Sequence, residues 1–471
     1  MRGGSPALSR QLLSLLKNRG ALLAAPAPYR ARRALALALV DEALHAVDAY
    51  AATARALRQL TIPHGNTLHV LAFGKAAHGM ARACLDYLPI TGGVVIGLHA
   101  EPLSPLRVLV GQHPDPCDQA PEHAAQLLAY AATLGPKDSA LCLISGGGSA
   151  LLELPRPGLS LEQLRQTSRL LMRAGADIGE LNRVRQALSQ VKGGGLLTAL
   201  GDAHVVNLLL SDVIGSSPEL IASGPTTLPS VDPAAAARAV IRRFGLQGQL
   251  APGVRAQLFD APPAAPPAAP ARRRGPAPEQ HIVADNDTAR AALIAAARSH
   301  CLILDSIPGH ASGLAQLAAR QIWSAAHGRE TPGAGLAWGG ETLVRLRGPA
   351  GLGGRSQELA LEWALLGLDP TPETSPHGSA SAAAPAQPQD PLNQADLGLL
   401  VSFGSDGIDG ASPAAGALID GHSLAQLSLA TCRDALARHD SYSLLASVGS
   451  TLVTGPTGTN VADLMFWLPN A

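Results

Sequence analysis

The stretch Leu141–Leu152, LCLISGGGSALL, joins an apolar run to three glycines flanked by serines. A short continuous apolar run of this kind is typical of a strand buried on both faces of a parallel sheet. Three successive glycines are entropically costly to order. Because ligands bind beyond the carboxyl ends of strands in open α/β sheets, glycines there can bring backbone N–H groups close to an anion. We therefore expect this stretch to end a central strand and begin a binding loop.

Four further clusters of glycine with Ser, Thr, Lys or Asp also follow apolar runs. They are Gly74-Lys75, Ser211 to Gly215, Gly404 to Gly410 and Thr454 to Asn460. Tight strand-to-helix turns favour glycine as well, so one cluster alone would leave both interpretations open. Five clusters of this composition favour anion binding.

Strand-like and helical patterns alternate along the chain, which predicts an α/β fold with a largely parallel sheet. Two segments are low in complexity, a Pro/Ala-rich linker at 261–280 and an insert at about 370–394 that we expect to be disordered. They suggest two α/β domains, 35–260 and 281–471, that meet at a cleft. Residues 1–34 are expected to form an extension that is flexible or resembles a transit peptide.

Composition limits the possible partners. The 36 basic and 36 acidic side chains balance to a net charge of zero, which argues against nucleic acid or a membrane surface as a partner. Five scattered cysteines without a CxxC pair fit a reducing compartment. We therefore expect a cytoplasmic protein. The alternative is a mitochondrial one, because the N-terminal segment is basic and has no acidic residue before Asp41.

Lysine is rare in this chain, and the four examples are Lys17, Lys75, Lys137 and Lys192. A lysine retained among so many arginines can mark a place that needs a compact point charge. Lys75 and Lys192 adjoin glycines and are the stronger candidates.

The segment ELNRVRQALSQVKGGGL, 180–196, has helical spacing. On a helix, Asn182, Arg185 and Ser189 would share one face, with Lys192 one turn further on. Such a face would suit a carboxylate with neighbouring hydroxyls. The alternative is a solvated helix face closed by a glycine C-cap at Gly193.

Acidic and basic side chains beside other glycines extend the list. Asp212 could hold Mg²⁺, orient a hydroxyl or cap a helix. Asp406 and Asp409 could bind a metal or cap a turn. Arg355 follows a glycine pair at a predicted helix start, where the helix dipole disfavours a cation, so we interpret it as a clamp for a transferring phosphoryl group.

Standard nucleotide signatures are absent, since the sequence has neither GxxxxGK[ST] nor GxGxxG in a strand-turn-helix unit. The residues alone therefore indicate an α/β enzyme for an anionic, phosphorylated small molecule. Seven segments together resemble the class II glycerate 2-kinase family, whose C-terminal part is known as MOFRL. They are FGKAAHGMA, LISGGGSALL, LNRVRQALSQVKGGGL, LSDVIGSSPELIASGPT, GGETLVRLRGPAGLGGRSQELAL, GSDGIDGASPAAGA and DSYSLLASVGSTLVTGPTGTNVADL.

The resemblance implies a Rossmann-like N-terminal domain, a smaller MOFRL-type α/β domain and an active site in the cleft between them. It implies phosphorylation of D-glycerate to 2-phosphoglycerate by ATP with Mg²⁺, and it is compatible with a homodimer. Lys75 and Arg355 match the family's proposed catalytic cations. Asp212 is our candidate for proton removal and, with Asp406, for Mg²⁺. The candidates for substrate or phosphate binding are Ser145, Gly146, Gly147, Gly148, Ser149, Asn182, Arg185, Ser189, Lys192, Ser223, Gly224, Thr226, Thr457, Thr459 and Asn460.

Several positions depart from the family pattern. A serine, Ser216 or Ser217, replaces an acidic residue, Ser356 and Ser405 stand where the family has Asn and Thr, and residues 411–413 read ASP where it has GPT. Two alternative functions remain open. One is a hydroxypyruvate reductase, a name that some relatives carry, and the other is an inactive relative that senses glycerate or a nucleotide.

Overall fold

The computed structural model describes residues 14–63, 65–215, 217–260, 275–328, 334–346, 348–368 and 397–470. The chain divides into two compact units, which are described here one at a time. The parallel-sheet unit comprises Val47–Asn286 and Gly458–Val461. The mixed-sheet unit comprises Met1–Ala46, Asp287–Thr457 and Ala462–Ala471.

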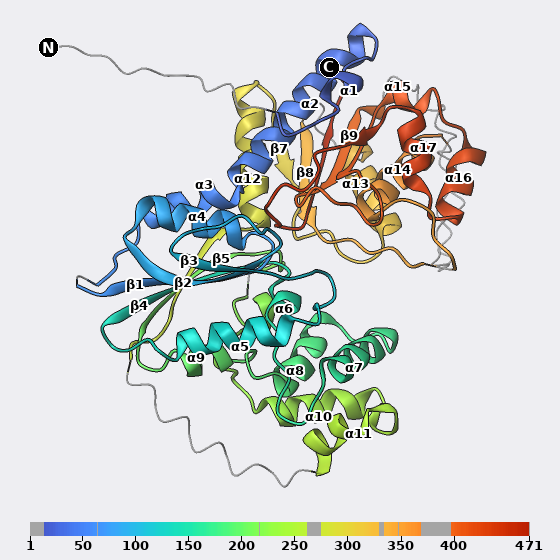
Figure 1. Ribbon diagram of the computed structural model, residues 1–471. Helices are drawn as coiled ribbons and strands as arrows, with labels where there is room; N and C mark the ends of the chain where they lie inside the picture. The colour runs from blue at the N-terminus through green and yellow to red at the C-terminus, as the bar shows by residue number, and fades with distance from the viewer. Residues whose placement is uncertain are drawn as a thin grey trace, which may run out of the picture. The chain divides into compact units, whose positions relative to one another are not determined.

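The parallel-sheet unit is built on six strands in the order β3-β2-β1-β4-β5-β6, and every neighbouring pair is parallel (Figure 1). This is the strand order of the Rossmann fold. The chain adds strands toward one edge of the sheet from β1 to β3 and then toward the other edge from β4 to β6, so the order reverses between β1 and β4. The predicted Rossmann-like fold is therefore confirmed. The strands are β1 (Thr67–Phe73), β2 (Ile90–Gly97), β3 (Leu106–Val110), β4 (Asp138–Ser145), β5 (His204–Leu210) and β6 (Glu279–Ala284).

Both faces of this sheet are covered by helices (Figure 1). On one side lie α3 (Ala49–Leu57) and α4 (Ala77–Tyr87), and on the other lie α5 (Ala120–Ala131) and α9 (Gly195–Ala199). Phe73, Cys142 and Ile144 belong to the apolar core under α5. Burial on both faces explains why β4 reads as a continuous apolar run.

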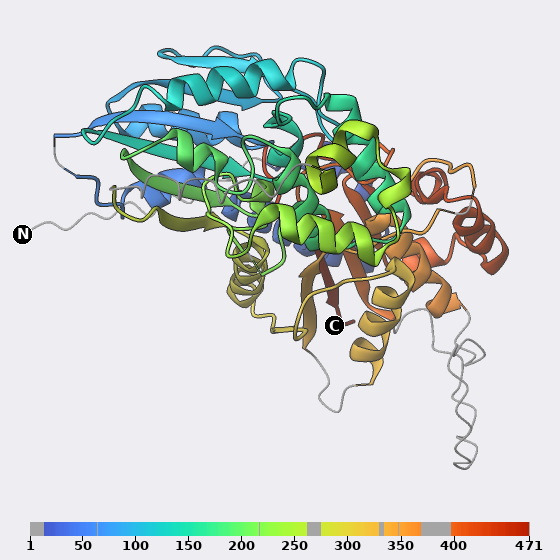
Figure 2. The same cartoon turned by 90° about the horizontal axis from the view of Figure 1, so that it is seen from below.

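A separate cluster of helices packs beyond this sheet, drawn in green in Figures 1 and 2. It contains α7 (Leu161–Arg173), α8 (Ile178–Leu188), α10 (Pro233–Arg243) and α11 (Pro252–Arg255), whereas α6 (Gly148–Leu151) packs with the core of the sheet. Reciprocal hydrogen bonds of Ser160 with Gln163 and of Asp177 with Glu180 form capping boxes that begin α7 and α8.

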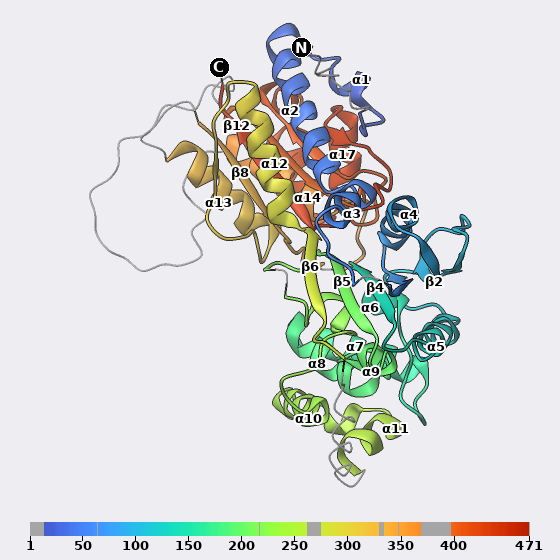
Figure 3. The same cartoon turned by 90° about the vertical axis from the view of Figure 1, so that its left-hand side faces the viewer.

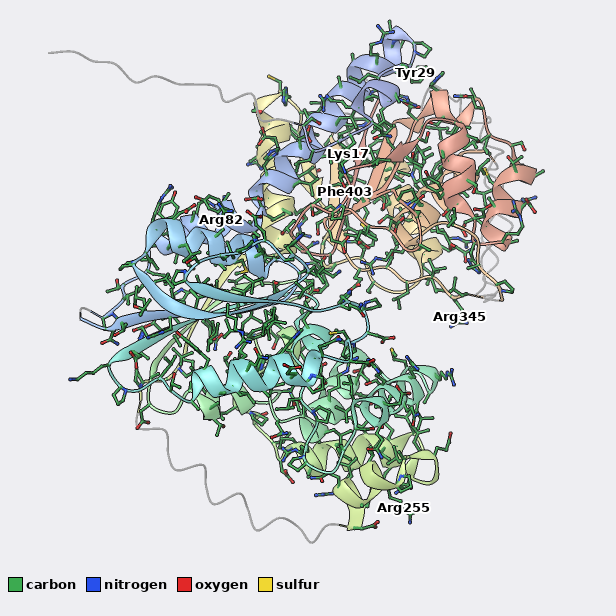
Figure 4. All side chains as sticks on the ribbon, in the orientation of Figure 1. Lys17, Tyr29, Arg82, Arg255, Arg345 and Phe403 are labelled. Atoms are coloured by element: carbon green, nitrogen blue, oxygen red, sulfur yellow. The ribbon has the colours of Figure 1, made fainter. Side chains whose placement is uncertain are left out.

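The mixed-sheet unit holds the second six-stranded sheet, in the order β11-β10-β9-β12-β8-β7. Only β7 and β8 run parallel, and the other pairs are antiparallel. Phe403 of β9, labelled in Figure 4, is buried in this unit. The strands are β7 (Leu304–Ser306), β8 (Gly335–Gly340), β9 (Leu399–Gly404), β10 (Gly416–Ile419), β11 (Thr451–Leu452) and β12 (Asp463–Leu468).

The longest helices of this unit are α2 (Ala27–Ala46), α12 (Asn286–Ser299) and α14 (Arg355–Leu368). Helices α2 and α12 lie side by side in Figures 1 and 3. Trp363 places the largest fully buried side chain of the unit on α14. The remaining helices are α1 (Arg19–Leu22), α13 (Ala315–His327), α15 (Gly421–Leu424), α16 (Leu429–Ala437) and α17 (Ser441–Ser447).

A buried ion pair fixes α2 to this unit. Arg33 donates from Nε and Nη2 to the two carboxylate oxygens of Asp420, at 2.7 and 2.8 Å, and from Nη2 to Ser423 Oγ. Both charged side chains are 3% exposed. Residues 14–34 are therefore part of the packed unit, which differs from the flexible extension that we expected.

The boundary between the units also differs from our expectation. We placed residues from 281 onward in the second domain, but β6 pairs with β5 and completes the parallel sheet, so the units divide at Asn286. Of the predicted linker and insert, residues 261–274 and 369–396 lie outside the described part of the chain. None of the described helices combines the length and apolarity needed to cross a membrane.

Glu362 on α14 gives the mixed-sheet unit a measurable pH dependence. Burial raises the pKa of Glu362 to about 7, and nearby Glu358 adds to the rise while Arg320 opposes it. Between about pH 4.3 and pH 7 the unfolded chain loses this proton while the folded chain keeps it, so Glu362 lowers stability as the pH rises. We expect Glu362→Gln to raise the free energy of unfolding by on the order of 1 kcal/mol at pH 8 and by little at pH 4.5.

Urea unfolding at the two pH values measures this difference. The exposed Glu42 on α2 provides the control, and Glu42→Gln should show no such difference between the two pH values. An equal gain from Glu362→Gln at both pH values would contradict the assignment.

Candidate active site

The carboxyl ends of β1 and β4 bring the first two glycine clusters together. Lys75 donates its backbone N–H to Gly146 O at 2.9 Å, and Ala76 N donates to Ser145 Oγ at 3.0 Å. Gly74 adopts φ +123°, and a Cβ atom there would overlap Ser145. This turn therefore requires glycine, and the fully buried Ser145 hydroxyl accepts a backbone hydrogen bond of the neighbouring loop.

The central glycines allow four polar side chains to approach the loop closely. A Cβ atom on Gly146 would lie 2.5 Å from Asp212 Cγ and 3.0 Å from Asn460 Nδ2. A Cβ atom on Gly147, which has φ +77°, would lie 2.9 Å from His113 Cδ2 and 3.0 Å from Lys75 Cγ. Since either Cβ would need these groups to move, close approach explains the entropic cost of the glycine run. A Cβ atom on Gly148 would meet Ala222, so this glycine allows packing against the next loop.

Asp212 and Asn460 meet although they are far apart in the sequence. Asn460 Nδ2 donates to Asp212 Oδ2 at 2.9 Å. The segment Gly458–Val461 is fixed in the parallel-sheet unit by two bonds, from Thr459 Oγ1 to Val47 O at 2.6 Å and from Asn286 Nδ2 to Val461 O at 2.8 Å. Two predicted site residues are thus brought together, while Thr459 serves to hold the segment.

A chain of hydrogen bonds links three predicted segments. Ser223 Oγ donates to Asn182 Oδ1 at 2.9 Å and lies 2.8 Å from Ser149 Oγ. Ala222, Ser223 and Gly224 all have positive φ, at 51°, 63° and 63°. This conformation costs energy for Ala and Ser, and such strain is concentrated at functional sites. Thr226, in the same loop, is buried.

Glu153 organises the residues that follow α8. Its Oε1 accepts from Ser189 Oγ at 2.7 Å, and its Oε2 accepts from Lys192 Nζ at 2.5 Å. Glu153 and Lys192 are 4% and 2% exposed. Burial lowers the pKa of Lys192, and Glu153 opposes this effect. Lys192 is therefore held in an internal ion pair.

The helix itself ends earlier than we expected. Helix α8 stops at Leu188, and Ser189 is extended, with φ −110° and ψ 148°. The expectation that Asn182, Arg185, Ser189 and Lys192 continue one helical face is therefore wrong beyond Leu188. The sequence offers no proline or glycine before Gly193 to mark that end.

Arg185 is a half-buried cation on α8. Among the described residues, none lies within hydrogen-bond or ion-pair distance of its guanidinium. Burial lowers its pKa, while the charges of Glu153 and Asp115 act in the opposite direction. A partly buried guanidinium without a bonded partner is suited to a carboxylate or phosphate ligand.

In the mixed-sheet unit, two carboxylates hold Arg355 at the start of α14. Its Nε and Nη2 contact Asp463 Oδ2 and Oδ1 at 2.6 and 3.0 Å, and its Nη1 contacts Glu341 Oε1 at 2.5 Å. Burial alone would lower the pKa of Arg355, but Asp463 and Glu341 together raise it. Burial also raises the pKa of Asp463 to about 7, and Arg355 offsets only part of that rise.

Asp409 and Asp406 have separate roles around this arginine. Asp409 accepts from Ser356 N, Gln357 N and Gln357 Nε2 at 3.0, 2.8 and 2.8 Å, so it caps α14. Burial raises the pKa of Asp409, against the effect of these donors. Asp406 accepts from Ile408 N at 3.1 Å.

Asp406 and Asp463 both approach the Cβ position of Gly404. A Cβ atom on Gly404 would be 3.3 Å from Asp406 Oδ1 and 3.5 Å from Asp463 Oδ1. Thr457 donates from Oγ1 to Ser405 O at 2.6 Å, so it belongs to this unit, unlike Thr459 and Asn460.

The described residues contain no group of three or more His, Cys, Asp or Glu side chains that could hold a metal ion. Mg²⁺ at phosphoryl-transfer sites commonly uses only one or two carboxylates together with substrate phosphates. Asp212 in the parallel-sheet unit and Asp406 in the mixed-sheet unit are each a carboxylate of the kind that such an ion uses.

Four side chains of these networks were missed from the sequence, namely His113, Glu153, Glu341 and Asp463. Glu153 and Asp463 are almost fully buried, and each adjoins an apolar run in the sequence. An acidic residue at the edge of an apolar run is therefore the sequence signal that could have identified them. His113 follows β3 at the same sheet edge as the glycine loops and could have been found by that position.

The close approach at Gly146 can be tested by Gly146→Ala. The added Cβ should displace Asp212 and Asn460, and we expect the implied phosphoryl-transfer rate to fall by about 100-fold, since misplacement by about 1 Å costs that much. Gly248, which has no atom within 4 Å of its Cβ position, provides the control Gly248→Ala. Steady-state kinetics compare the variants, and near wild-type activity of Gly146→Ala would contradict the role given to this contact.

Comparison with known proteins assigns the chain to a family. Residues 35–259 match a domain of unknown function, DUF4147, and residues 334–463 match the MOFRL family. The glycerate 2-kinase of Pyrococcus horikoshii is 31% identical over 468 residues, which cover 92% of this chain and 96% of that protein. A hydroxypyruvate reductase by name, from Agrobacterium vitis, is 34% identical over 411 residues, covering 84% and 97%.

A solved structure agrees with these sequence matches. The crystal structure of glycerate kinase from Thermotoga maritima is similar with a TM-score of 0.76 and 30% identity, covering 93% of this chain and 99% of that one. With the parallel sheet in Rossmann order and the MOFRL match over the mixed-sheet unit, these similarities show that the chain belongs to the glycerate 2-kinase family.

Proposed function

We propose that this chain transfers the γ-phosphoryl group of ATP to the 2-hydroxyl of D-glycerate and so forms 2-phosphoglycerate. The observation that carries the proposal is the arrangement around Gly146 and Gly147, where Lys75, Asp212 and Asn460 lie against one loop at the carboxyl edge of a Rossmann sheet. Phosphates are commonly bound at such an edge.

The proposed chemistry depends on positioning and charge. Phosphoryl transfer leaves little covalent work for the protein, and cations that neutralise the transferring group supply most of the catalysis. Lys75 has its Cγ against Gly147 and can direct its ammonium to a phosphate near this loop. We assign Arg355 the same task, with Asp463 and Glu341 fixing its orientation.

Binding of glycerate is assigned to α8 and the loops beside it. Arg185, whose guanidinium lacks a bonded partner among the described residues, would take the glycerate carboxylate. Asn182, Ser149 and Ser223 are neutral donors and acceptors suited to hydroxyls. Ser189 and Lys192 would support this site through Glu153.

Mg²⁺ is part of the proposal. Asp212 in the parallel-sheet unit and Asp406 in the mixed-sheet unit are each candidates to hold it, and the ion would neutralise charge on the ATP phosphates. A homodimer, with which the family resemblance is compatible, also stays a prediction.

The competing reductase function needs a bound nicotinamide cofactor. The sequence has no GxGxxG fingerprint after β1, where such a cofactor's pyrophosphate would bind, and the corresponding residues are FGKAAHG. A name carried by a relative is its main support.

The direct test is a coupled ADP-release assay with ATP, Mg²⁺ and D-glycerate, followed by NMR of the product. We expect ADP release that depends on D-glycerate and a phosphorus coupled to the proton on carbon 2. NADH oxidation with hydroxypyruvate, without ADP release, would establish the reductase function instead. Binding of ATP or glycerate in a thermal-shift assay without turnover of either kind would identify an inactive relative.

Lys75→Ala tests the cation beside the glycine loop. We expect kcat to fall by about 1,000-fold, because a cation on the transferring group contributes on the order of 10³ or more to such reactions. Lys75→Arg should recover only part of this loss, since a planar fork replaces a point charge. Lys137 is exposed, so Lys137→Ala serves as the control and should leave kcat unchanged. A Lys75→Ala enzyme with most of its activity would refute the role.

A further inference from the structure

We propose that His113 is the general base that removes the proton from the substrate hydroxyl during phosphoryl transfer. This inference rests on the proposed function and adds a residue to it. His113 follows β3 (Leu106–Val110), the strand at the edge of the parallel sheet, so it emerges at the same carboxyl edge as the glycine loop.

The loop that carries His113 is anchored to α7 by two arginines. Arg165 donates to Pro116 O at 2.5 Å and to Asp118 Oδ1 at 3.0 Å. Arg169 contacts Asp115 Oδ2 at 3.3 Å. The loop after His113 is thus tied at Asp115, Pro116 and Asp118, which limits where the imidazole can lie.

The imidazole itself lies against the centre of the proposed phosphate loop. A Cβ atom on Gly147 would be 2.9 Å from His113 Cδ2 and 3.5 Å from its Nε2. Lys75 Cγ would be 3.0 Å from the same point. His113 and Lys75 therefore share one glycine, and a phosphoryl group beside Lys75 would lie near an imidazole nitrogen.

Asp212 and Glu153, the other candidate bases of this unit, have other tasks in the proposed mechanism. Asp212 accepts a hydrogen bond from Asn460 and is the carboxylate suited to Mg²⁺. Both oxygens of Glu153 are occupied by Ser189 and Lys192. His113 is exposed, so a proton that it takes up can pass directly to water.

The charges that face His113 come from several elements. Lys75, on the loop after β1, contributes a positive charge at the same glycine, and Asp212, on the loop after β5, contributes a negative charge beside the adjacent Gly146. On its own loop, Asp115 is paired with Arg169 of α7 and is also attracted to Arg185 of α8. Histidine is the side chain that most often serves as a general base, and the geometry at Gly147 places this one beside the proposed phosphate loop.

The step balances as follows. The 2-hydroxyl proton passes to a ring nitrogen of neutral His113 while the oxygen forms a bond to the γ-phosphorus. The bond between that phosphorus and the β,γ-bridging oxygen breaks, and its electron pair leaves with ADP. The imidazolium then releases its proton to water.

The test compares pH profiles of kcat/KM for D-glycerate in wild type, His113→Asn and the control His99→Asn. His99 is an exposed histidine that follows the neighbouring strand β2. We expect His113→Asn to lose about 100-fold or more at pH 7.5 and to lose the acid limb of the profile, because a general base contributes about 10² to 10⁴. His99→Asn should keep both rate and limb.

A second variant separates proton transfer from positioning. In His113→Ala, added imidazole should restore part of kcat in proportion to its basic form. A slow His113→Asn enzyme that keeps the acid limb, together with no rescue of His113→Ala by imidazole, would overturn the assignment. The assignment would also be overturned if Asp212→Asn lost the acid limb while His113→Asn kept it. These results presuppose that the wild type releases ADP with D-glycerate, and failure there would count against the proposed function itself.

Discussion

The close approach of side chains to a loop without Cβ atoms is the constraint on which the parallel-sheet site depends. Asp212 and Asn460 occupy the space that a side chain at 146 would need, and Lys75 and His113 occupy the space at 147. These four residues come from four different loops, after β1, β3, β5 and β11, and all of them contact the same glycine loop. The price of ordering three glycines is explained by what they bring together, whether or not their amides also bind an anion.

Carboxylates that fix cations are a second recurring feature. The buried carboxylates Asp420 and Glu153 hold Arg33 and Lys192, and the buried Asp463 together with the exposed Glu341 holds Arg355. A buried pair of this kind contributes little net stability over apolar residues, but it is costly to break from one side. Such pairs define where a cation lies, which suits a chain whose proposed chemistry depends on charge placement.

Much of this architecture could be predicted from the sequence. The apolar runs before Gly74, Gly146 and Ser211 are β1, β4 and β5, because strands buried on both faces need continuous apolar residues. The glycine clusters at 74 and 146 do meet at one sheet edge. Local patterns of this type depend on neighbouring residues only, so a single sequence contains them.

Other features depend on distant partners and could not be read in this way. The strand β6 follows a Pro/Ala-rich stretch that indicated a domain boundary, and only its pairing with β5 assigns it to the first sheet. Helix α8 ends at Leu188 without a breaking residue, since Ser189 turns to reach Glu153, 36 positions earlier. Asp463 meets Arg355 across 108 positions, and nothing in the spacing marks that pair.

The four-residue segment Gly458–Val461 carries a consequence for how this protein can be divided. It lies near the end of the chain, yet it belongs to the parallel-sheet unit and supplies the amide that bonds to Asp212. A fragment ending at residue 259, where the first family match stops, would lack both this amide and the sixth strand. No single cut in the chain can therefore yield an intact parallel-sheet unit. The hydrogen bond from Asn460 to Asp212 would form only after nearly the whole polypeptide had been synthesised.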